Sequence, residues 1–422
     1  MKKIIQQKFD IAVVGGGPAG MMAAGRAAEL GARVVLIEKN KNLGQKLLIT
    51  GKGRCNITNA EFDDRKFIEK LGKNGKFLFS SLATFGSKEI INFFETRGLP
   101  TKTERGGRVF PVSDKAQDVL DKLTIYLKEN NVRTIPNNRV KGFEIEKGKI
   151  QSVKIDNGKS TEKIYANKFI LCLGGKSYPS TGSTGEGYVF ARKMGHKIIE
   201  PRPALTPIKT KEDWVKNLQG LSLKNVKINI FQGSKKQDER FGEMLFTHFG
   251  LSGPIILDVS KKVDELLQLG EVRIEIDLKP ALSFPELNKR IQKDFAENGK
   301  KDFKNYLGEL LPQKMIETFV QLSEIDPKKK IHFITQNERK RMLHLLKNLN
   351  VTAVKLADFD QAIITSGGVD IHEVDSKTMQ SIIISNLFLA GEILDLDGPT
   401  GGFNLQICWS TGYAAGTYAS KK

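Results

Sequence analysis

Three glycines near the start of the chain have the spacing of a nucleotide-binding turn. Gly15, Gly17 and Gly20 form the pattern G-x-G-x-x-G within VVGGGPAG. The first glycine permits a tight turn, the second lets a pyrophosphate approach the backbone, and the third lets a helix pack closely on a strand. Glu38 follows at the distance where an acid would hold the ribose hydroxyls of an adenosine. The sequence therefore predicts a bound dinucleotide.

The segments around these glycines are typical of a βαβ unit. The apolar run 11–14 has the length of a buried strand, and 34–37 is a second such run. Pro18 suits the first helical position, where its missing N–H costs nothing. The helix that follows offers free N–H groups and a partial positive charge at its N-terminus, and both favour phosphate.

A glycine-rich basic loop, KLLITGKGRCN, comes next. Its flexible backbone and the cations Lys46, Lys52 and Arg54 could follow a phosphate or the edge of an anionic ring, although an ordinary surface loop has the same composition. Cys55 has two interpretations. Lys52 and Arg54 could lower the pKa of its thiol and make it reactive, or the residue is a small buried hydrophobe.

Two further stretches contain possible proton donors or ligands. The apolar strand 169–173 leads into Gly174-Gly175 and the loop KSYPSTGSTGEGY, where Tyr178 could form a wall of the cofactor site; a flexible surface loop is the alternative. In GEMLFTHFGLSGP, aromatic residues and glycines crowd around His248. This histidine is a candidate ligand or proton donor, whereas a lone histidine is more often structural.

The C-terminal part repeats the strand-and-glycine pattern. The strand 387–390 ends at Gly391-Glu392, and Gly401 and Gly402 open a final helix rich in small residues. The N-terminus of such a helix, aimed at N1 and the C2 carbonyl of a flavin, would stabilise the negative charge of the reduced ring. The alternative is a plain closing helix.

Several of these stretches together resemble the BaiN/RdsA-like NAD(P)/FAD-dependent oxidoreductases, a family of the glutathione-reductase superfamily of two-segment flavoproteins. The similarity lies in GGGPAG, KLLITGKGRCN, GRVFPVSDKA, the LGGxSYP turn, ExLFTHFGLSGP and AGEILDxDGPTGGFNLQ, and it covers nearly the whole chain. The resemblance implies a bound FAD. The residues implied to hold it are Gly15, Gly17, Pro18, Ala19, Gly20, Glu38, Lys39, Lys46, Gly53, Arg54, Cys55, Asn56, Gly174, Gly175, Gly391, Glu392, Gly401, Gly402, Phe403 and Asn404.

The predicted fold is α/β, with a Rossmann-like FAD-binding domain interrupted by an insertion. We expect residues 1–197 and 351–422 to form the discontinuous FAD-binding domain. Short alternating strands predict a small β-rich domain over 198–283, and helical periodicity with many lysines predicts a helical subdomain over 284–350.

Composition narrows the class of protein. The 422 residues are 39% hydrophobic and 27% charged, and no apolar stretch approaches the roughly 20 residues that a membrane span needs. MKKIIQQ leads almost directly into the first strand without an apolar signal region, which favours a cytoplasmic protein. Three scattered cysteines predict neither a disulfide framework nor a metal site.

The net charge of +19 indicates a lysine-rich solvated surface or a basic cleft for an anionic ligand, and a nucleic-acid partner is disfavoured.

Family activities implied by the resemblance are the NAD(P)H-dependent reduction of conjugated C=C bonds in steroid-like acids and the oxidation of small amines such as aminoacetone. We favour an FAD-dependent oxidoreductase that reduces a small or steroid-like organic substrate. His248, Tyr178 and Cys55 are the candidate catalytic residues. No second G-x-G-x-x-G exists, so NAD(P)H would dock transiently on the flavin. The alternatives are an amine oxidase, an RNA-modifying flavoprotein and a non-catalytic flavoprotein; the sequence predicts no oligomeric state.

Overall fold

The computed structural model describes residues 9–421, and its chain divides into two compact units. The first unit consists of Met1–Pro203 and Ala362–Lys422, and the second is Ala204–Gln361. The first boundary lies six residues beyond the predicted 197, and the second lies eleven residues beyond the predicted 351. The second is displaced because strand β16 (Leu349–Leu356) pairs with strands of the second unit. A separate helical domain over 284–350 stays a prediction.

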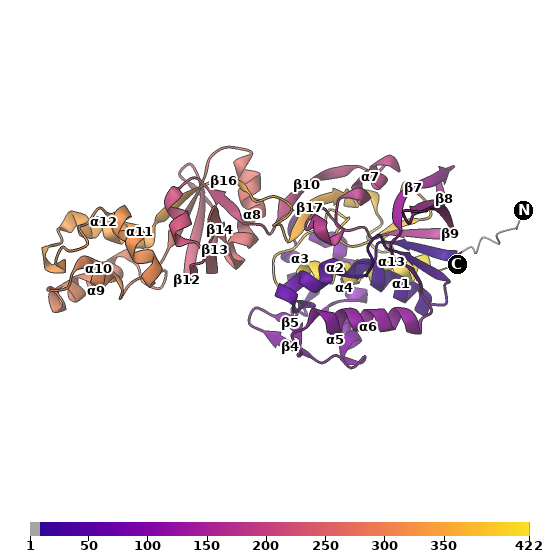
Figure 1. Ribbon diagram of the computed structural model, residues 1–422, viewed down its shortest axis with the longest axis horizontal. Helices are drawn as coiled ribbons and strands as arrows, with labels where there is room; N and C mark the ends of the chain where they lie inside the picture. The colour runs from indigo at the N-terminus through magenta and orange to yellow at the C-terminus, as the bar shows by residue number, and fades with distance from the viewer. Residues whose placement is uncertain (1–8, 422) are drawn as a thin grey trace, which may run out of the picture. The chain divides into compact units, whose positions relative to one another are not determined.

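A twisted, largely parallel sheet forms the centre of the first unit (Figure 1). Its strand order is β6-β2-β1-β9-β8-β7, and β18 pairs with the end of β9. The apolar runs predicted as strands are buried in it, with Val14 beside Leu171 and Leu171 beside Leu389. The strands are β1 (Phe9–Val14), β2 (Val34–Ile37), β6 (Arg133–Ile135), β7 (Arg139–Glu146), β8 (Lys149–Asp156), β9 (Thr161–Leu171) and β18 (Leu387–Leu389).

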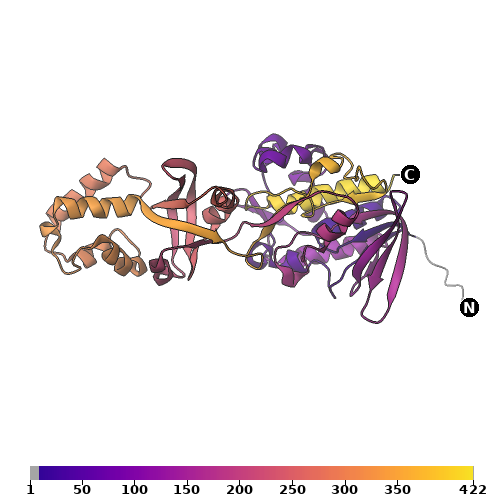
Figure 2. The ribbon, with the colours of Figure 1, turned by 90° about the horizontal axis from the view of Figure 1, so that it is seen from above.

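Helices α1 (Pro18–Glu29) and α13 (Phe403–Ala419) pack against one another although they are far apart in the sequence. A Cβ on Gly412 would lie 2.5 Å from the carbonyl oxygen of Ala19, and one on Gly416 would lie 2.4 Å from that of Ala23. Only glycine permits this approach. It brings the C-terminal helix (yellow in Figure 2) onto the helix that follows the first strand.

Shorter elements complete the first unit. A small sheet, β3-β5-β4, lies beside the helices, and β10 pairs with β17. The helices and strands concerned are α2 (Gln45–Ile49), η1 (Thr50–Gly53), β3 (Thr58–Asn59), α3 (Asp64–Glu69), η2 (Gly72–Leu78), α4 (Phe79–Thr84), α5 (Ser87–Glu95), β4 (Thr101–Glu104), β5 (Arg108–Pro111), α6 (Ala116–Glu129), η3 (Pro179–Thr181), α7 (Glu186–Lys193), β10 (Ile198–Ala204), β17 (Ile364–Val369) and η7 (Ile371–Glu373).

The second unit is built on a closed antiparallel barrel. Alternating residues such as Ile228, Ile230, Ile274 and Ile276 point inward and are buried, as the period of a strand requires. The barrel order is β11 (Ile208–Thr210), β14 (Gly250–Ser252), β13 (Lys235–Phe246), β12 (Ser222–Gln232), β15 (Val272–Asp277) and β16. Its helices are η4 (Asp213–Leu218), α8 (Pro254–Leu267), α9 (Phe284–Glu297), α10 (Phe303–Leu307), η5 (Gln313–Met315), α11 (Ile316–Ser323), η6 (Ile331–Phe333) and α12 (Gln336–Lys347).

The predicted fold class is confirmed: a Rossmann-type α/β domain carries an inserted antiparallel barrel with helices. Within residues 9–421, none of the helices has the length and apolar character that crossing a bilayer requires.

Candidate functional site

The turn between β1 and α1 has the geometry that its glycines predict. Gly15 has φ of +104°, and a Cβ there would lie 2.3 Å from the carbonyl oxygen of Cys172. A Cβ on Gly20 would lie 1.8 Å from the carbonyl oxygen of Gly15. Around Gly17, in contrast, nothing lies within 4 Å of the Cβ position. The turn is therefore tightly packed on its inner side and open at the N-terminus of α1, which Pro18 begins.

Glu38, at the end of β2, is buried and binds two backbone groups. Its Oε2 accepts from the N–H of Gly16 at 2.7 Å, and its Oε1 accepts from that of Asn40 at 2.8 Å. The carboxylate thus joins the glycine turn to the next loop. The adjacent Lys39 instead forms an ion pair with Glu186 at 2.7 Å.

The basic loop after α2 is held by an ion pair. Arg54 donates to Glu104 at 2.8 Å and to Asp114 at 3.2 Å, and its guanidinium lies 3.9 Å from the centre of the Phe110 ring. These bonds raise the pKa of Arg54 and lower the pKa of Glu104. Gly53, beside it, has φ of +83° with almost no neighbour at its Cβ position.

The next residues in this loop point inward. Cys55 is fully buried, and burial raises the pKa of its thiol to about 12. Of its two interpretations, the small buried hydrophobe fits the structure and the lowered pKa does not, because burial dominates and Arg54 is paired with acids. The side-chain Oδ1 of Asn56 is buried and has no hydrogen-bond partner among the described residues. Such an oxygen is a candidate acceptor for a ligand.

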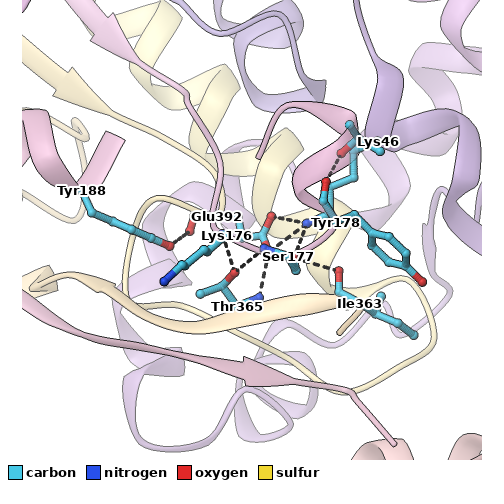
Figure 3. Close-up of polar contacts among 9 residues, drawn as sticks. Lys46, Lys176, Ser177, Tyr178, Tyr188, Ile363, Thr365 and Glu392 are labelled. Atoms are coloured by element: carbon cyan, nitrogen blue, oxygen red, sulfur yellow. Dashed lines mark hydrogen bonds and ion pairs between the residues drawn. The ribbon is translucent and has the colours of Figure 1, made fainter. Parts of the chain in front are cut away.

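A charged network joins α2 to the loops that follow β9 and β18 (Figure 3). Lys46 Nζ lies 2.7 Å from Glu392 Oε2 and 2.6 Å from Ser177 Oγ. Oε1 of Glu392 also accepts from the backbone N–H of Thr365 at 2.9 Å, and Thr365 Oγ1 accepts from the N–H groups of Lys176 and Ser177. The predicted residues Lys46 and Glu392 therefore bind each other. Neither Ser177 nor Thr365 was predicted as a site residue, although Ser177 lies within the LGGxSYP turn.

Glycines without side chains leave room for the network of Lys46, Glu392, Ser177 and Thr365. A Cβ on Gly175 would lie 2.4 Å from Thr365 Oγ1, and Gly174 has φ of +69°. Gly391, directly after β18, would place a Cβ 2.7 Å from that of Ala19 in α1. The N–H of Gly391 donates to Thr411 Oγ1 in α13 at 2.9 Å. The two halves of the first unit therefore meet at these glycines.

The turn that opens α13 is fixed by distant residues. Gly401 and Gly402 have φ of +112° and +102°, and a Cβ on Gly402 would lie 2.3 Å from the backbone of Thr58. Asn59 donates to the carbonyl oxygens of Gly401 at 2.9 Å and Gly106 at 3.0 Å. Asn404 accepts from the N–H of Gly398 at 2.9 Å, which closes the loop before the helix.

Helices α1 and α13 share one electrostatic property. Neither N-cap, Gly17 or Gly402, provides a side-chain hydrogen bond, and neither first turn contains an acid. The free N–H groups and the positive ends of both helix dipoles are therefore available to an anionic ligand. The α1 turn begins where the parallel strand β1 ends, which is where open α/β sheets bind ligands, whereas the α13 turn follows β18 after the loop 390–402.

The remaining catalytic candidates, Tyr178 and His248, lie in loops of different units. Tyr178 has φ of +51°, a strained conformation for a tyrosine, and its ring points away from Thr365 and Glu392 (Figure 3). His248 belongs to the second unit, where it is exposed in the turn between β13 and β14 beside Phe249.

Comparison with known proteins places the chain in a family. The model of the HI0933-like protein Rossmann domain matches residues 9–418. The chain is 32% identical over 416 residues to 3-dehydro-bile acid delta(4,6)-reductase of Clostridium scindens, covering 98% of this chain and 99% of that protein. It is 28% identical over 415 residues to the ribosomal RNA dihydrouridine synthase of Escherichia coli, with 97% of each covered. The enzyme of that name from Haemophilus influenzae is also 28% identical, over 99% of this chain and 100% of that protein.

Solved structures share the fold. A flavocytochrome c3 fumarate reductase has a TM-score of 0.55 at 17% identity, covering 98% of this chain and 78% of that one. The 3-ketosteroid-delta4-(5alpha)-dehydrogenase of Rhodococcus jostii has a TM-score of 0.53 at 15% identity, covering 100% and 99%. At these identities the likeness concerns the fold alone. With the family match over nearly the whole chain, the predicted resemblance is confirmed: this chain belongs to the HI0933-like Rossmann family and is an FAD-dependent oxidoreductase.

Proposed function

We propose that this protein reduces a C=C bond conjugated with a carbonyl group, with electrons that pass from NAD(P)H through FAD. The names of its relatives support this reaction. A delta(4,6)-reductase saturates double bonds of a 3-dehydro-bile acid, and dihydrouridine differs from uridine by one saturated bond next to a carbonyl. The two substrates have little in common except a double bond of this kind.

The observation that carries the proposal is the pair of uncapped helix N-termini, that of α1 directly after the parallel strand β1 and that of α13 after the loop 390–402. The α1 turn would hold the pyrophosphate through Gly15, Gly17, Pro18, Ala19 and Gly20, since the space at Gly17 is open. Glu38 would accept the adenosine ribose hydroxyls with lone pairs that Gly16 and Asn40 leave unused, and Lys39 lies next to it. A dinucleotide in this position fits the geometry of the turn.

The loops from the other segments would surround the rest of the cofactor. Asn56 has a buried acceptor without a partner, which suits a hydroxyl or ring N–H of the ligand. Lys46 and Glu392 would bind ribityl hydroxyls or the ring edge through the network with Ser177. The other residues proposed for this part are Gly53, Arg54, Cys55, Gly174, Gly175, Gly391, Gly401, Gly402, Phe403 and Asn404.

When bound, FAD supplies hydride transfer between the nicotinamide and the conjugated double bond. The chain's own contribution is electrostatic and acid–base. The N-terminus of α13 would stabilise negative charge at the pyrimidine edge of the ring. Tyr178 is the proposed proton donor to the substrate, because its strained backbone directs the ring away from the buried network of Lys46 and Glu392. His248 is the second candidate. The buried Cys55 thiol is better suited to a packing role.

An anaerobic titration tests this function. We expect purified protein to contain flavin that NADH or NADPH bleaches, and a 3-oxo-Δ4 steroid should restore the oxidised spectrum without oxygen. Tyr178→Phe should slow this reoxidation and leave bleaching by the nicotinamide unchanged, whereas Tyr165→Phe, in strand β9, serves as a matched control. Bleaching by neither nucleotide would contradict the proposed donor. Bleaching by aminoacetone alone would instead support an amine oxidase.

Uridine in RNA is a second candidate substrate. The net charge of +19 and the two relatives named as ribosomal RNA dihydrouridine synthases favour it. Incubation of reduced enzyme with a uridine-containing RNA should then add two hydrogens to a uridine, which mass spectrometry of the digested RNA detects. Failure with RNA and success with the steroid would assign the enzyme to small substrates.

A further inference from the structure

A group of exposed cations lies on α3 and η2 of the first unit (labelled α3 in Figure 1). We call it the α3–η2 basic cluster; its members are Arg65, Lys66, Lys70, Lys73 and Lys76, all exposed. On the opposite side of these elements, Phe67, Ile68, Leu71 and Phe77 are buried. The amphipathic pattern therefore fixes the two elements to the core and directs five cations into solvent.

These five cations have no counter-ions. Among the ion pairs of residues 9–421, none involves a member of the α3–η2 basic cluster, and Glu69 is the only acid between Arg65 and Lys76. The more conspicuous lysine runs of the second unit differ. There, Lys329 pairs with Glu338, Lys330 with Asp302 and Arg341 with Glu324. The basic runs that stand out in the sequence are therefore partly neutralised by ion pairs.

Two exposed aromatic rings flank the cluster. Phe62 is 50% exposed and Phe79 is 48% exposed, although phenylalanines of this size are usually buried. Lys88 Nζ lies 5.5 Å from the centre of the Phe62 ring. Exposed rings beside cations are the combination that binds single-stranded nucleic acid, because bases stack on the rings while phosphates meet the cations.

The cluster is attached to the loop that opens α13. The rings of Phe67 and Phe403 lie 4.7 Å apart between centres, and Lys70 Nζ lies 6.0 Å from the Phe403 ring. Asn74 donates to the backbone and the carboxylate of Asp395 at 2.8 Å each. A ligand on the cluster would therefore lie next to the turn that we assign to the flavin.

We propose that the α3–η2 basic cluster, with Phe62 and Phe79, is the docking surface for a single-stranded or looped RNA whose uridine is the substrate. This inference rests on the RNA form of the proposed function. An anionic membrane fits less well, because Glu61 and Asp63 flank Phe62 and would have to enter the lipid headgroups with the ring. A base can stack on the same ring from the solvent.

Fluorescence anisotropy with a labelled, uridine-rich RNA hairpin tests the surface on the flavin-loaded full chain. The triple variant Lys66→Gln, Lys70→Gln, Lys73→Gln should weaken binding at least tenfold. It should also reduce the slope of log Kd against log salt by about 2, since each contact with a single strand contributes about 0.7. The matched control, Lys329→Gln with Lys330→Gln and Arg341→Gln, loses the same charge and should retain wild-type binding. Phe62→Ala and Phe79→Ala should each weaken binding about tenfold with the salt slope unchanged.

The readouts separate failure of this inference from failure of the proposed function. Flavin content, bleaching by NAD(P)H and reduction of a steroid enone should be unchanged in every variant, since none of these residues belongs to the proposed cofactor site. Equal loss in the two triple variants would contradict the α3–η2 surface, as would wild-type protein that binds no RNA. Binding to phosphatidylserine vesicles in preference to the hairpin would identify a membrane surface and overturn the RNA proposal.

Discussion

The two glycine turns that open α1 and α13 are alike in electrostatics and different in how they are built. Both helices have a glycine N-cap without a side-chain hydrogen bond. The α1 turn is packed partly by its own neighbours, since Gly20 meets the carbonyl of Gly15, and partly by Cys172, which Gly15 meets. The α13 turn is packed by residues far away in the sequence, since Gly402 meets Thr58 and Gly401 binds Asn59. In the proposed site, a largely local motif would hold one end of the ligand, and a tertiary arrangement would hold the other.

The largest effect should come from adding a side-chain carbon inside the α1 turn. In Gly20→Ala, the Cβ would lie 1.8 Å from a backbone oxygen that cannot move without opening the turn. We expect a loss of at least about 3 kcal/mol in unfolding free energy, at the upper end of overpacking, and no bound flavin. Urea denaturation and the ratio of flavin to protein absorbance measure both.

Gly17→Ala is the control for that substitution. Its Cβ meets no protein atom within 4 Å, so the flavin-free protein should lose no more than about 1 kcal/mol, the cost of alanine at an N-cap. FAD affinity should nevertheless fall at least tenfold, because the open space is where we place the pyrophosphate. Wild-type affinity would show that the pyrophosphate binds elsewhere.

Adding a side-chain carbon inside the α13 turn should have the second-largest effect. Gly402→Ala combines a φ of +102° with a Cβ 2.3 Å from the Thr58 backbone, and we expect a cost of about 2–3 kcal/mol together with weaker FAD binding. Gly158→Ala is a matched control, because it has φ of +82° with open space around its Cβ and should cost only about 1 kcal/mol. Equal costs in the two variants would show that the contact with Thr58 relaxes freely.

The difference between the two glycine turns also explains which site residues could be predicted from the sequence. The α1 turn was predicted with its strands, its glycine roles and the acid Glu38, because the contacts of Gly20 and Glu38 lie within one βαβ unit, although Gly15 also meets the distant Cys172 carbonyl. Gly401, Gly402 and Glu392 were recognised by family resemblance. Asn59, Ser177 and Thr365 were missed, since each has at least one partner more than 100 residues away. Of the three, Ser177 alone lies in a motif of the family resemblance, the LGGxSYP turn.

Of the two interpretations of Cys55, the structure supports the small buried hydrophobe and not the thiol with a lowered pKa. Adjacent Lys52 and Arg54 suggested a lowered pKa, but the neighbours in space decide it. The thiol points into the core, and Arg54 turns toward Glu104 and Asp114. Charge that is close in the sequence does not act on a group that the fold directs away from it.

Removal of a side chain that holds the α13 turn should have an intermediate effect. Asn59→Ala would leave the carbonyls of Gly401 and Gly106 without their donor, at a cost of about 1–3 kcal/mol. FAD affinity should fall less than in Gly402→Ala, because the backbone of the turn itself is unchanged. Asn138→Ala, which removes one exposed bond to Pro136, should change neither quantity. An Asn59 variant that loses stability but binds FAD normally would separate this link from the ligand.

The smallest expected effect is a pH dependence confined to the C-terminal segment. His196 is buried between Glu373 and Ser381, with Nδ1 3.2 Å from Glu373 Oε2 and Nε2 2.9 Å from Ser381 Oγ. Ser381 Oγ also accepts from the N–H groups of Ile383 and Ile384. Burial lowers the pKa of His196, although the Glu373 carboxylate acts in the opposite direction.

Since the pKa of His196 is lower in the folded chain than in the unfolded chain, the unfolded chain takes up the proton first as the pH falls. The neutral imidazole therefore contributes full stability above its ordinary value of about 6.5, and that contribution decreases toward the lower folded-state pKa. Hydrogen exchange of residues 379–386, corrected for its intrinsic pH dependence, should be faster at pH 5.5 than at pH 7.5. His196→Gln should abolish the difference, whereas His372→Gln, with its exposed ring in the same segment, should preserve it. The opposite sign, with greater protection at pH 5.5, would mean that Glu373 outweighs burial and holds His196 as the imidazolium.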